Sequence, residues 1–161
     1  MNHSRDDDVP AGMSHNIERE AQTLGVQLQR VDVGTPEALD GALAALVQRG
    51  ADAILLSEGP PFGGSTLSQI LAFARQHRLP TSSGGRHNAT AGVLLAYGAH
   101  AHDLCQRSAV FVDKILKGVT PADLPVERAH KFEFIVNLTT AKSLGLTLPP
   151  TPLFQADEVL Q

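Results

Sequence analysis

The sequence has no tryptophan, one tyrosine and one cysteine, and only 4% of its 161 residues are aromatic. The single Cys105 cannot form a disulfide within the chain, and its place on an apolar helical stripe predicts a packed side chain rather than a reactive thiol. No apolar run approaches the roughly 18 residues of a membrane-spanning helix. No paired cysteines, H-E-x-x-H or G-x-S-x-G pattern is present, so we expect no metal site, no cofactor and no catalytic residue.

Basic residues are also few. The 13 lysines and arginines are outnumbered by 17 aspartates and glutamates, which gives a net charge of −4. This balance argues against a nucleic-acid partner, which requires a basic face. Hydrophobic residues make up 42% of the chain, enough for one domain with its own core, since a chain of this size buries roughly 68–70% of its unfolded surface.

Helical and strand patterns alternate along the chain, and glycines separate many of them. The apolar spacing predicts helices over 13–24, 36–47, 65–74, 104–116 and 139–144. It predicts strands over 26–33, 53–56, 80–83, 93–96 and 132–136. Short loops between alternating helices and strands imply parallel strands with right-handed crossovers. The expected fold class is therefore α/β, a three-layer α/β/α sandwich with a mostly parallel sheet.

In such a sheet, ligands bind beyond the carboxyl ends of the strands. Polar and aromatic residues that follow three of the predicted strands are therefore candidates for ligand binding: Ser57, Glu58, Phe62, Ser83, Arg86 and Tyr97. A guanidinium such as that of Arg86 can hold a ligand carboxylate in a bidentate pair. Tyr97 can stack on a ring or donate its hydroxyl. A purely structural interpretation is also open, in which Glu58 and Arg86 form a surface ion pair and Tyr97 lies at a core edge.

Five short motifs occur in order near the end of the chain: VDKILKG, PADLP, FEFIVNL, TAKSLGLTLPP and ADEVL. Together they resemble the C-terminus of ABC-transporter substrate-binding proteins, bacterial solute receptors with a two-lobed periplasmic-binding fold, in the subgroup related to tryptophan/tyrosine transport. The run PTSSGGRHNATAGVLLAYG matches the same family and keeps Arg86 and Tyr97. It departs from the family where Ser82 and Asn88 stand in place of apolar residues, and these departures make the expected pocket more polar.

The resemblance implies that residues 13–161 are the second lobe of such a receptor plus its C-terminal return segment, with the first lobe missing. Residues 1–12 form a disordered leader where the family has an apolar strand. We expect the strands 26–33 and 53–56 either to pair directly or to leave the sheet open for a partner. The helix that contains Arg107 and Lys117 loses the lobe on which it packs in the family. Its apolar stripe is then exposed or buried against a second chain, which makes a homodimer an expected partner.

The function that the resemblance implies is solute binding for an ABC-type importer, with a small, amino acid-like ligand in a cleft between lobes and an ABC permease as partner. No enzymatic activity is expected. Half a cleft buries little of a ligand, so this chain alone should bind weakly or not at all. The family is periplasmic, whereas the sequence as written begins without a signal-peptide pattern and would remain cytoplasmic. Alternatives are an inactive fragment, a small flavodoxin-like enzyme that uses Glu58 or a histidine, and a regulator's sensory domain.

Overall fold

The computed structural model describes residues 11–57 and 64–161, and the chain divides into two compact units, Met1–Asp32 and Val33–Gln161. Most of the predicted leader lies outside the described residues. No helix within the described ranges is long and apolar enough to cross a membrane. The two units are described separately below.

The described part of the first unit contains one helix, α1 (Ala11–Thr23), which the spacing predicts. The Val26 amide donates to the Ala21 carbonyl at 2.8 Å just beyond the helix end. The strand predicted for 26–33 is wrong, because this segment has no regular structure. Its apolar alternation slips between Leu28 and Val31, and a strand requires a neighbour to accept and donate its backbone hydrogen bonds.

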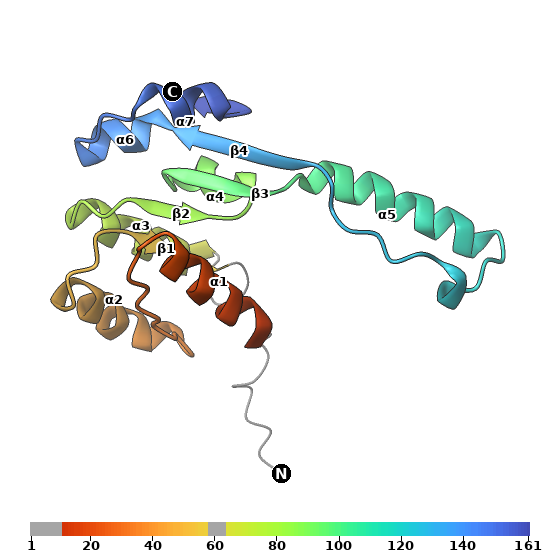
Figure 1. Cartoon of the computed structure of the whole chain (residues 1–161), viewed down its shortest axis with the longest axis horizontal. Coiled ribbons are helices and arrows are strands. Elements are labelled where there is room, and N and C mark those ends of the chain that lie inside the picture. Colours follow the sequence, from red (N-terminus) through yellow and green to blue (C-terminus); the bar gives the residue numbers. More distant parts are fainter. Residues whose placement is uncertain (1–10, 58–63) are drawn as a thin grey trace, which may run out of the picture. The chain divides into compact units, whose positions relative to one another are not determined.

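The second unit alternates short strands with helices (Figure 1). Its five strands are β1 (Ile54–Leu55), β2 (Thr81–Ser83), β3 (Leu95–Ala99), β4 (Phe132–Asn137) and β5 (Glu158–Leu160). Its α-helices are α2 (Leu39–Gln48), α3 (Gly64–Gln76), α4 (Arg86–Ala91), α5 (Ala101–Leu116), α6 (Leu138–Leu144) and α7 (Pro150–Gln155). Two 3₁₀ turns complete it, η2 (Pro36–Ala38) and η3 (Pro121–Asp123).

The sheet follows chain order, β1-β2-β3-β4-β5. The pairs β1–β2, β2–β3 and β4–β5 are parallel, and only the pair β3–β4 is antiparallel. The α/β fold with a mostly parallel sheet flanked by helices is therefore confirmed. Direct pairing of residues 26–33 with β1 is wrong, since β1 pairs only with β2 among the described residues. The other edge of β1 carries no described strand, as expected for a sheet open on that side.

The larger part of the core lies on one face of the sheet, which we call the first face. Strand residues alternate between faces, and the register places Ile54, Thr81, Ala96 and Ile135 on this one. The helices α2 and α3 cover its β1 side in one apolar cluster that includes Ile54. On the β3–β4 side, Ala89 of α4 packs against Ala96 and Ile135, and all three are almost fully buried.

The opposite or second face carries Leu55, Ser82, Leu95, Tyr97 and Phe134, as the same register requires. Leu55 and Tyr97 are among the exposed large hydrophobic residues, whereas Leu95 is partly buried against α6. The second face is therefore much less covered than the first over β1 and the carboxyl end of β3.

The main differences from the sequence prediction concern the end of β3, the segment that begins at Arg86 and the segment after α6. The β3 strand continues through Tyr97 and Gly98, which were expected to end it, because both pair with β4. Arg86 begins a short helix, α4, that the apolar spacing does not predict. Gly145 ends α6, and Pro150 begins a further short helix, α7, since proline suits the first turn of a helix.

Candidate functional site

The carboxyl ends of β1, β2 and β3 lie at one edge of the sheet because these strands are parallel. Ser57 follows β1, and Gly84 follows β2. The last residue of β3, Ala99, pairs with Phe132, the first residue of β4. Since β4 runs in the opposite direction, its beginning belongs to the same edge. This edge is where an α/β sheet binds its ligands.

Two of the six candidate residues belong to the second face at this edge. Tyr97 lies on it by register, and 62% of its surface is exposed. Ser57 is exposed, and it stands two residues after Leu55, so strand alternation places it on the same face. Glu58 and Phe62 lie outside the described residues.

Arg86 belongs to the first face and already holds two carboxylates. Its guanidinium contacts Glu133 at 3.1 Å and Glu158 at 2.5 Å. The Glu133 side chain is buried and its Arg86 partner is half-exposed. The hydrogen bond that Arg86 donates to Glu158 is the main cause that raises the pKa of Arg86, opposed by burial and reinforced by the charge of Glu133. This cluster ties the start of α4 to β4 and β5.

Ser83 also belongs to the first face, where it is buried. Its hydroxyl donates to the Gly84 carbonyl at 3.0 Å. The structure therefore does not gather the candidate residues on one surface: Ser57 and Tyr97 are on the second face, and Ser83 and Arg86 are on the first.

Asn88 and Ala89 stand where the family pattern has bulkier apolar residues, and both are buried residues of α4. The Asn88 amide donates to the Gly84 carbonyl at 3.0 Å, while its Oδ1 has no partner among the described residues. The polar substitution at Asn88 thus supports the turn after β2 and does not line an open pocket.

Gly98 is the point where β3 and this turn approach each other most closely. A Cβ atom on Gly98 would lie 2.8 Å from the Gly85 nitrogen. Gly85 itself has a φ of 68°, a conformation that glycine adopts without strain. The three glycines Gly84, Gly85 and Gly98 therefore allow the turn to fold closely onto the first face of β3.

Sequence reasoning missed two aromatic residues of this edge, Phe132 and Phe134. The Tyr97 and Phe132 rings are nearly parallel, with centroids 5.8 Å apart and planes 14° apart. Phe134 meets Tyr97 edge-on at 6.4 Å. The available signal was the alternation in FEFIVNL, which predicts that Phe132 and Phe134 share a face. The candidate residues all follow predicted strands, whereas Phe132 stands at the beginning of a strand.

Two cavities among the described residues lie away from this edge. One holds about 10 Å³, room for roughly a single water, between α3 and α6. The other, of about 310 Å³, lies within the first unit between α1 and the segment after it. Within the described ranges, no three histidine, cysteine or acidic residues group as metal ligands.

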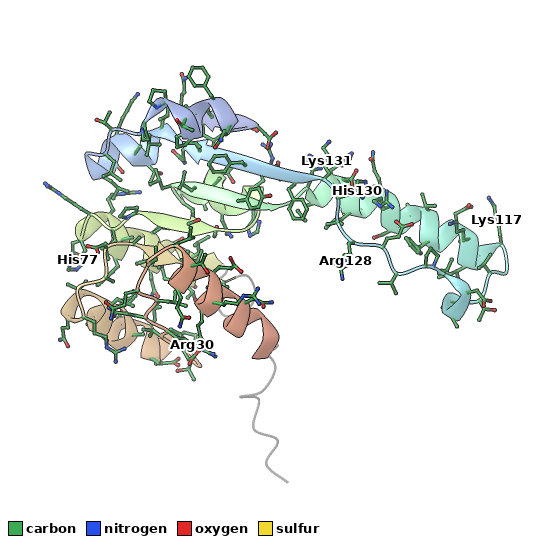
Figure 2. The ribbon with its side chains drawn as sticks, in the orientation of Figure 1. Arg30, His77, Lys117, Arg128, His130 and Lys131 are labelled. Atoms are coloured by element: carbon green, nitrogen blue, oxygen red, sulfur yellow. The ribbon has the colours of Figure 1, made fainter. Side chains whose placement is uncertain are left out.

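Helix α5 buries none of its 16 residues, so its apolar stripe is exposed in the single chain. The packed environment expected for Cys105 is wrong, because this side chain is exposed. The segment that returns from α5 to β4 is held beside the helix by Arg107, which pairs with Glu127 and lies 3.3 Å from His130. Figure 2 shows His130 and Lys131 where this segment reaches β4.

Three solved structures share this fold. A conserved domain protein of Vibrio cholerae aligns with a TM-score of 0.83 at 21% identity over 92% of this chain and 49% of its own. An ABC domain in complex with L-Trp from Streptococcus pneumonia aligns with a TM-score of 0.85 at 20% identity, over 98% of this chain and 53% of its own. The ligand-free, open structure of CD0873, a substrate-binding protein of Clostridium difficile with adhesive properties, aligns with a TM-score of 0.67 at 18% identity. The alignment covers 97% of this chain and 52% of that protein. The chain spans about half the length of each.

No curated protein matches the chain. The family model described as "ABC transporter substrate binding protein" matches residues 13–160, which is nearly the whole sequence. The chain belongs to the ABC transporter substrate binding protein family.

Proposed function

We propose that this chain is a solute-binding component of an ABC-type importer and that it binds a small, amino acid-like molecule at the carboxyl edge of β1, β2 and β3. Membership of the family supports a solute-binding role. The observation that carries the location is the exposed aromatic side chain of Tyr97 at that edge, on the uncovered second face. A structural relative in complex with L-Trp supports a ligand of the amino acid class.

The proposed site includes Ser57 and Tyr97 on the second face, with Glu58 and Phe62 following β1. Ser57 supplies a hydroxyl donor and acceptor, and Tyr97 supplies a flat apolar surface with a polar tip. Ligand roles for Ser83 and Arg86 stay predictions, and Arg86 would have to exchange Glu133 or Glu158 for a ligand carboxylate.

We further propose that the site works as one side of a cleft whose other side comes from a second lobe. Ligand pockets bury about 70–90% of a ligand's surface, and an open sheet edge buries far less. Closure of two lobes about a hinge supplies the rest and creates the form that a membrane permease recognises. The proposed location is periplasmic, as is typical of the family, and the proposed role involves no chemical change of the solute.

Titration with L-Trp tests the binding role directly. The chain has no tryptophan, so the indole emission of added L-Trp has no background from the protein. We expect weak, saturable binding in the millimolar range, because half a cleft leaves most of the ligand in water. Sub-micromolar binding by the monomer would contradict the half-site. No binding of any amino acid at tens of millimolar would contradict the proposed role and favour an inactive fragment.

We also propose that two copies of the chain associate through the helix that contains Arg107 and Lys117. At about 100° per residue, half of the α5 surface is free of charged side chains. This uncharged half comprises Ala101, Leu104, Cys105, Ser108, Ala109, Phe111, Val112, Ile115 and Leu116. An apolar helix face of this width is normally covered.

Sedimentation over a range of concentrations tests this association, with Val112→Glu as the variant on the uncharged half and Lys114→Glu as its match on the charged half. We expect dimers that Val112→Glu abolishes and Lys114→Glu retains. Exposed Cys105 gives a second readout, since paired helices bring two copies of this thiol within reach of a short crosslinker. A monomer at all concentrations would refute the dimer and leave the solute-binding proposal untouched.

A further inference from the structure

We infer that the start of α5 is a pH-sensitive switch, in which the His100 side chain caps the helix at neutral pH and releases it in mildly acidic solution. The inference concerns the helix that follows β3 and does not depend on the proposed solute binding. It assigns a role to a histidine that the proposed site does not use.

The hydrogen bond that caps α5 is the first support. His100 is the N-cap residue, and its Nδ1 accepts from the Asp103 backbone amide at 3.2 Å. The amide can only donate, so this bond requires a neutral ring with its proton on Nε2. Protonation turns Nδ1 into a donor, and two donors then face each other. The Asp103 amide is left without its partner at the start of the helix, where no helical carbonyl can replace it.

The type of residue at the cap is the second support. Helices usually begin with Ser, Thr, Asp or Asn, and none of these changes its charge near neutral pH. An imidazole gains its charge between about pH 8 and pH 5. A positive ring at a helix N-terminus also opposes the helix dipole. Both effects make the uncapped state bind the proton more readily, so the cap is present above this range and is lost as the pH falls through it.

The charged groups around His100 come from α5 and from the segment that returns to β4. The His102 ring lies 6.3 Å from the His100 ring, and a proton on it adds a like charge. Among the described residues, the Asp103 carboxylate lies 4.0 Å from the His130 ring, and no ion pair joins it to His100. On the returning segment, the Lys131 carbonyl accepts from the His100 amide at 3.0 Å, a backbone bond that does not depend on the charge of the ring.

His130 responds to the same change in pH, but its contributions oppose each other. Its Nε2 lies 3.3 Å from Arg107 Nη1 and 4.0 Å from Asp103 Oδ2, beside the start of α5 (Figure 2). The neutral ring accepts from Arg107, whereas the protonated ring is repelled by Arg107 and attracted to Asp103. The His130 side chain is 58% exposed, so solvent weakens both interactions. His100 is therefore the group that controls the first turn.

Loss of the cap changes the surface that α5 presents. Ala101 and Leu104 belong to its first turn and to its uncharged half. When the cap is lost, this turn frays and its part of the uncharged half no longer forms an ordered surface. Mildly acidic solution should therefore weaken any association through α5.

Amide–water exchange of Asp103, followed by NMR at about pH 7.5 and about pH 5.5, tests the switch. Expressed as a protection factor, the result is corrected for the direct effect of pH on exchange. We expect the protection of Asp103 to fall about 3- to 10-fold at the lower pH, the size of effect that an N-cap has on local stability. Buried Ile135 of β4 is the reference, and its protection should not change.

Three variants identify the titrating group. Asn is a good N-cap residue without a charge, so His100→Asn should keep the protection of Asp103 equal at both pH values. His100→Ala removes the acceptor and should give low protection at both. The matched control is His102→Asn, which lies on the same turn and leaves the cap bond in place, and it should retain the full pH dependence.

The outcomes are distinct. Equal protection of Asp103 at both pH values in the unchanged chain would overturn the switch. A pH dependence that persists in His100→Asn, or one that disappears in His102→Asn, would assign it to another group and also overturn it. Dilute protein without added solute is used throughout, so none of these results bears on the proposed function. Circular dichroism of each variant at both pH values shows that it is folded.

Discussion

Helices α3 and α5 both carry apolar side chains at helical spacing, yet α3 buries five of its 13 residues and α5 buries none of its 16. The difference does not come from the helices themselves. It comes from what lies opposite: α3 faces β1 and α2, whereas no described element covers the uncharged half of α5. An apolar stripe therefore shows which side of a helix is to be buried, and the partner decides whether it is.

The largest expected difference between the two helices is in how much the truncation of an isoleucine to alanine lowers the free energy of unfolding. Ile70 of α3 is 1% exposed and Ile115 of α5 is 41% exposed. We expect Ile70→Ala to lower the free energy of unfolding by about 2–5 kcal/mol, because it leaves a cavity. Ile115→Ala should change it by about 0.5 kcal/mol or less. Urea denaturation of both variants measures the difference, and equal losses would show that α5 is packed in solution.

A second comparison concerns two arginines, Arg86 of α4 and Arg107 of α5. Replacement of Arg86 by methionine leaves buried Glu133 without its partner, a loss that costs about 3–5 kcal/mol when both groups are buried. Because Arg86 is half-exposed, we expect Arg86→Met to lower the free energy of unfolding by a smaller amount, about 2–3 kcal/mol. The matched variant Arg107→Met removes the pair with Glu127, which is partly exposed on both sides, and should cost at most about 1 kcal/mol.

Thermal and urea unfolding of the two arginine variants test this order. If Arg86→Met were as mild as Arg107→Met, water would reach Glu133 freely, and Arg86 would be available to a ligand carboxylate after all. The same measurement therefore also bears on the ligand role that the sequence suggests for Arg86.

Sequence reasoning identified most of the elements, because periodicity and capping are local properties. Asn137 caps α6, with its Oδ1 accepting from the Thr140 amide at 2.9 Å, and Gly145 ends that helix in a left-handed conformation. The strand predicted over 26–33 is wrong because a strand is not a local property: it depends on neighbours that are distant in sequence.

The candidate site was only partly accessible from the sequence, for a related reason. Strand ends could be located, but the face on which a residue lies depends on the register between strands. Ser83 and Tyr97 both stand at strand ends in the sequence, yet the pairing of Ser83 with Ala96 places them on opposite faces. Phe132 became a candidate only when the antiparallel pair β3–β4 brought it to the same edge.

Two glycines extend the comparison to backbone conformation. A Cβ at Gly98 meets the Gly85 nitrogen at 2.8 Å, whereas a Cβ at Gly118, just after α5, meets nothing within 4 Å. We expect Gly98→Ala to cost about 1–3 kcal/mol through crowding. Gly118→Ala acts only through its φ of 97°, a strain of about 1 kcal/mol.

The two glycine variants should also differ in where the effect appears. Gly98→Ala should lower the urea midpoint of the whole unit, because the contact lies in the sheet. Gly118→Ala should mainly accelerate amide exchange at the C-terminal end of α5, since few interactions couple that end to the core. A loss of global stability with Gly118→Ala would show that the helix and the sheet unfold together.

The smallest expected effect is that of Lys117, whose amine pairs with Asp113 one helical turn earlier at 2.8 Å. Lys117→Ala removes this exposed pair and a positive charge at the carboxyl end of α5, together worth about 0.3–1 kcal/mol. If α5 opens independently of the sheet, the loss appears as faster exchange of the α5 amides at unchanged urea midpoint. If a second copy covers the helix, the effect on exchange disappears at high protein concentration. This dependence would distinguish a free helix from a docked one without any change to its apolar half.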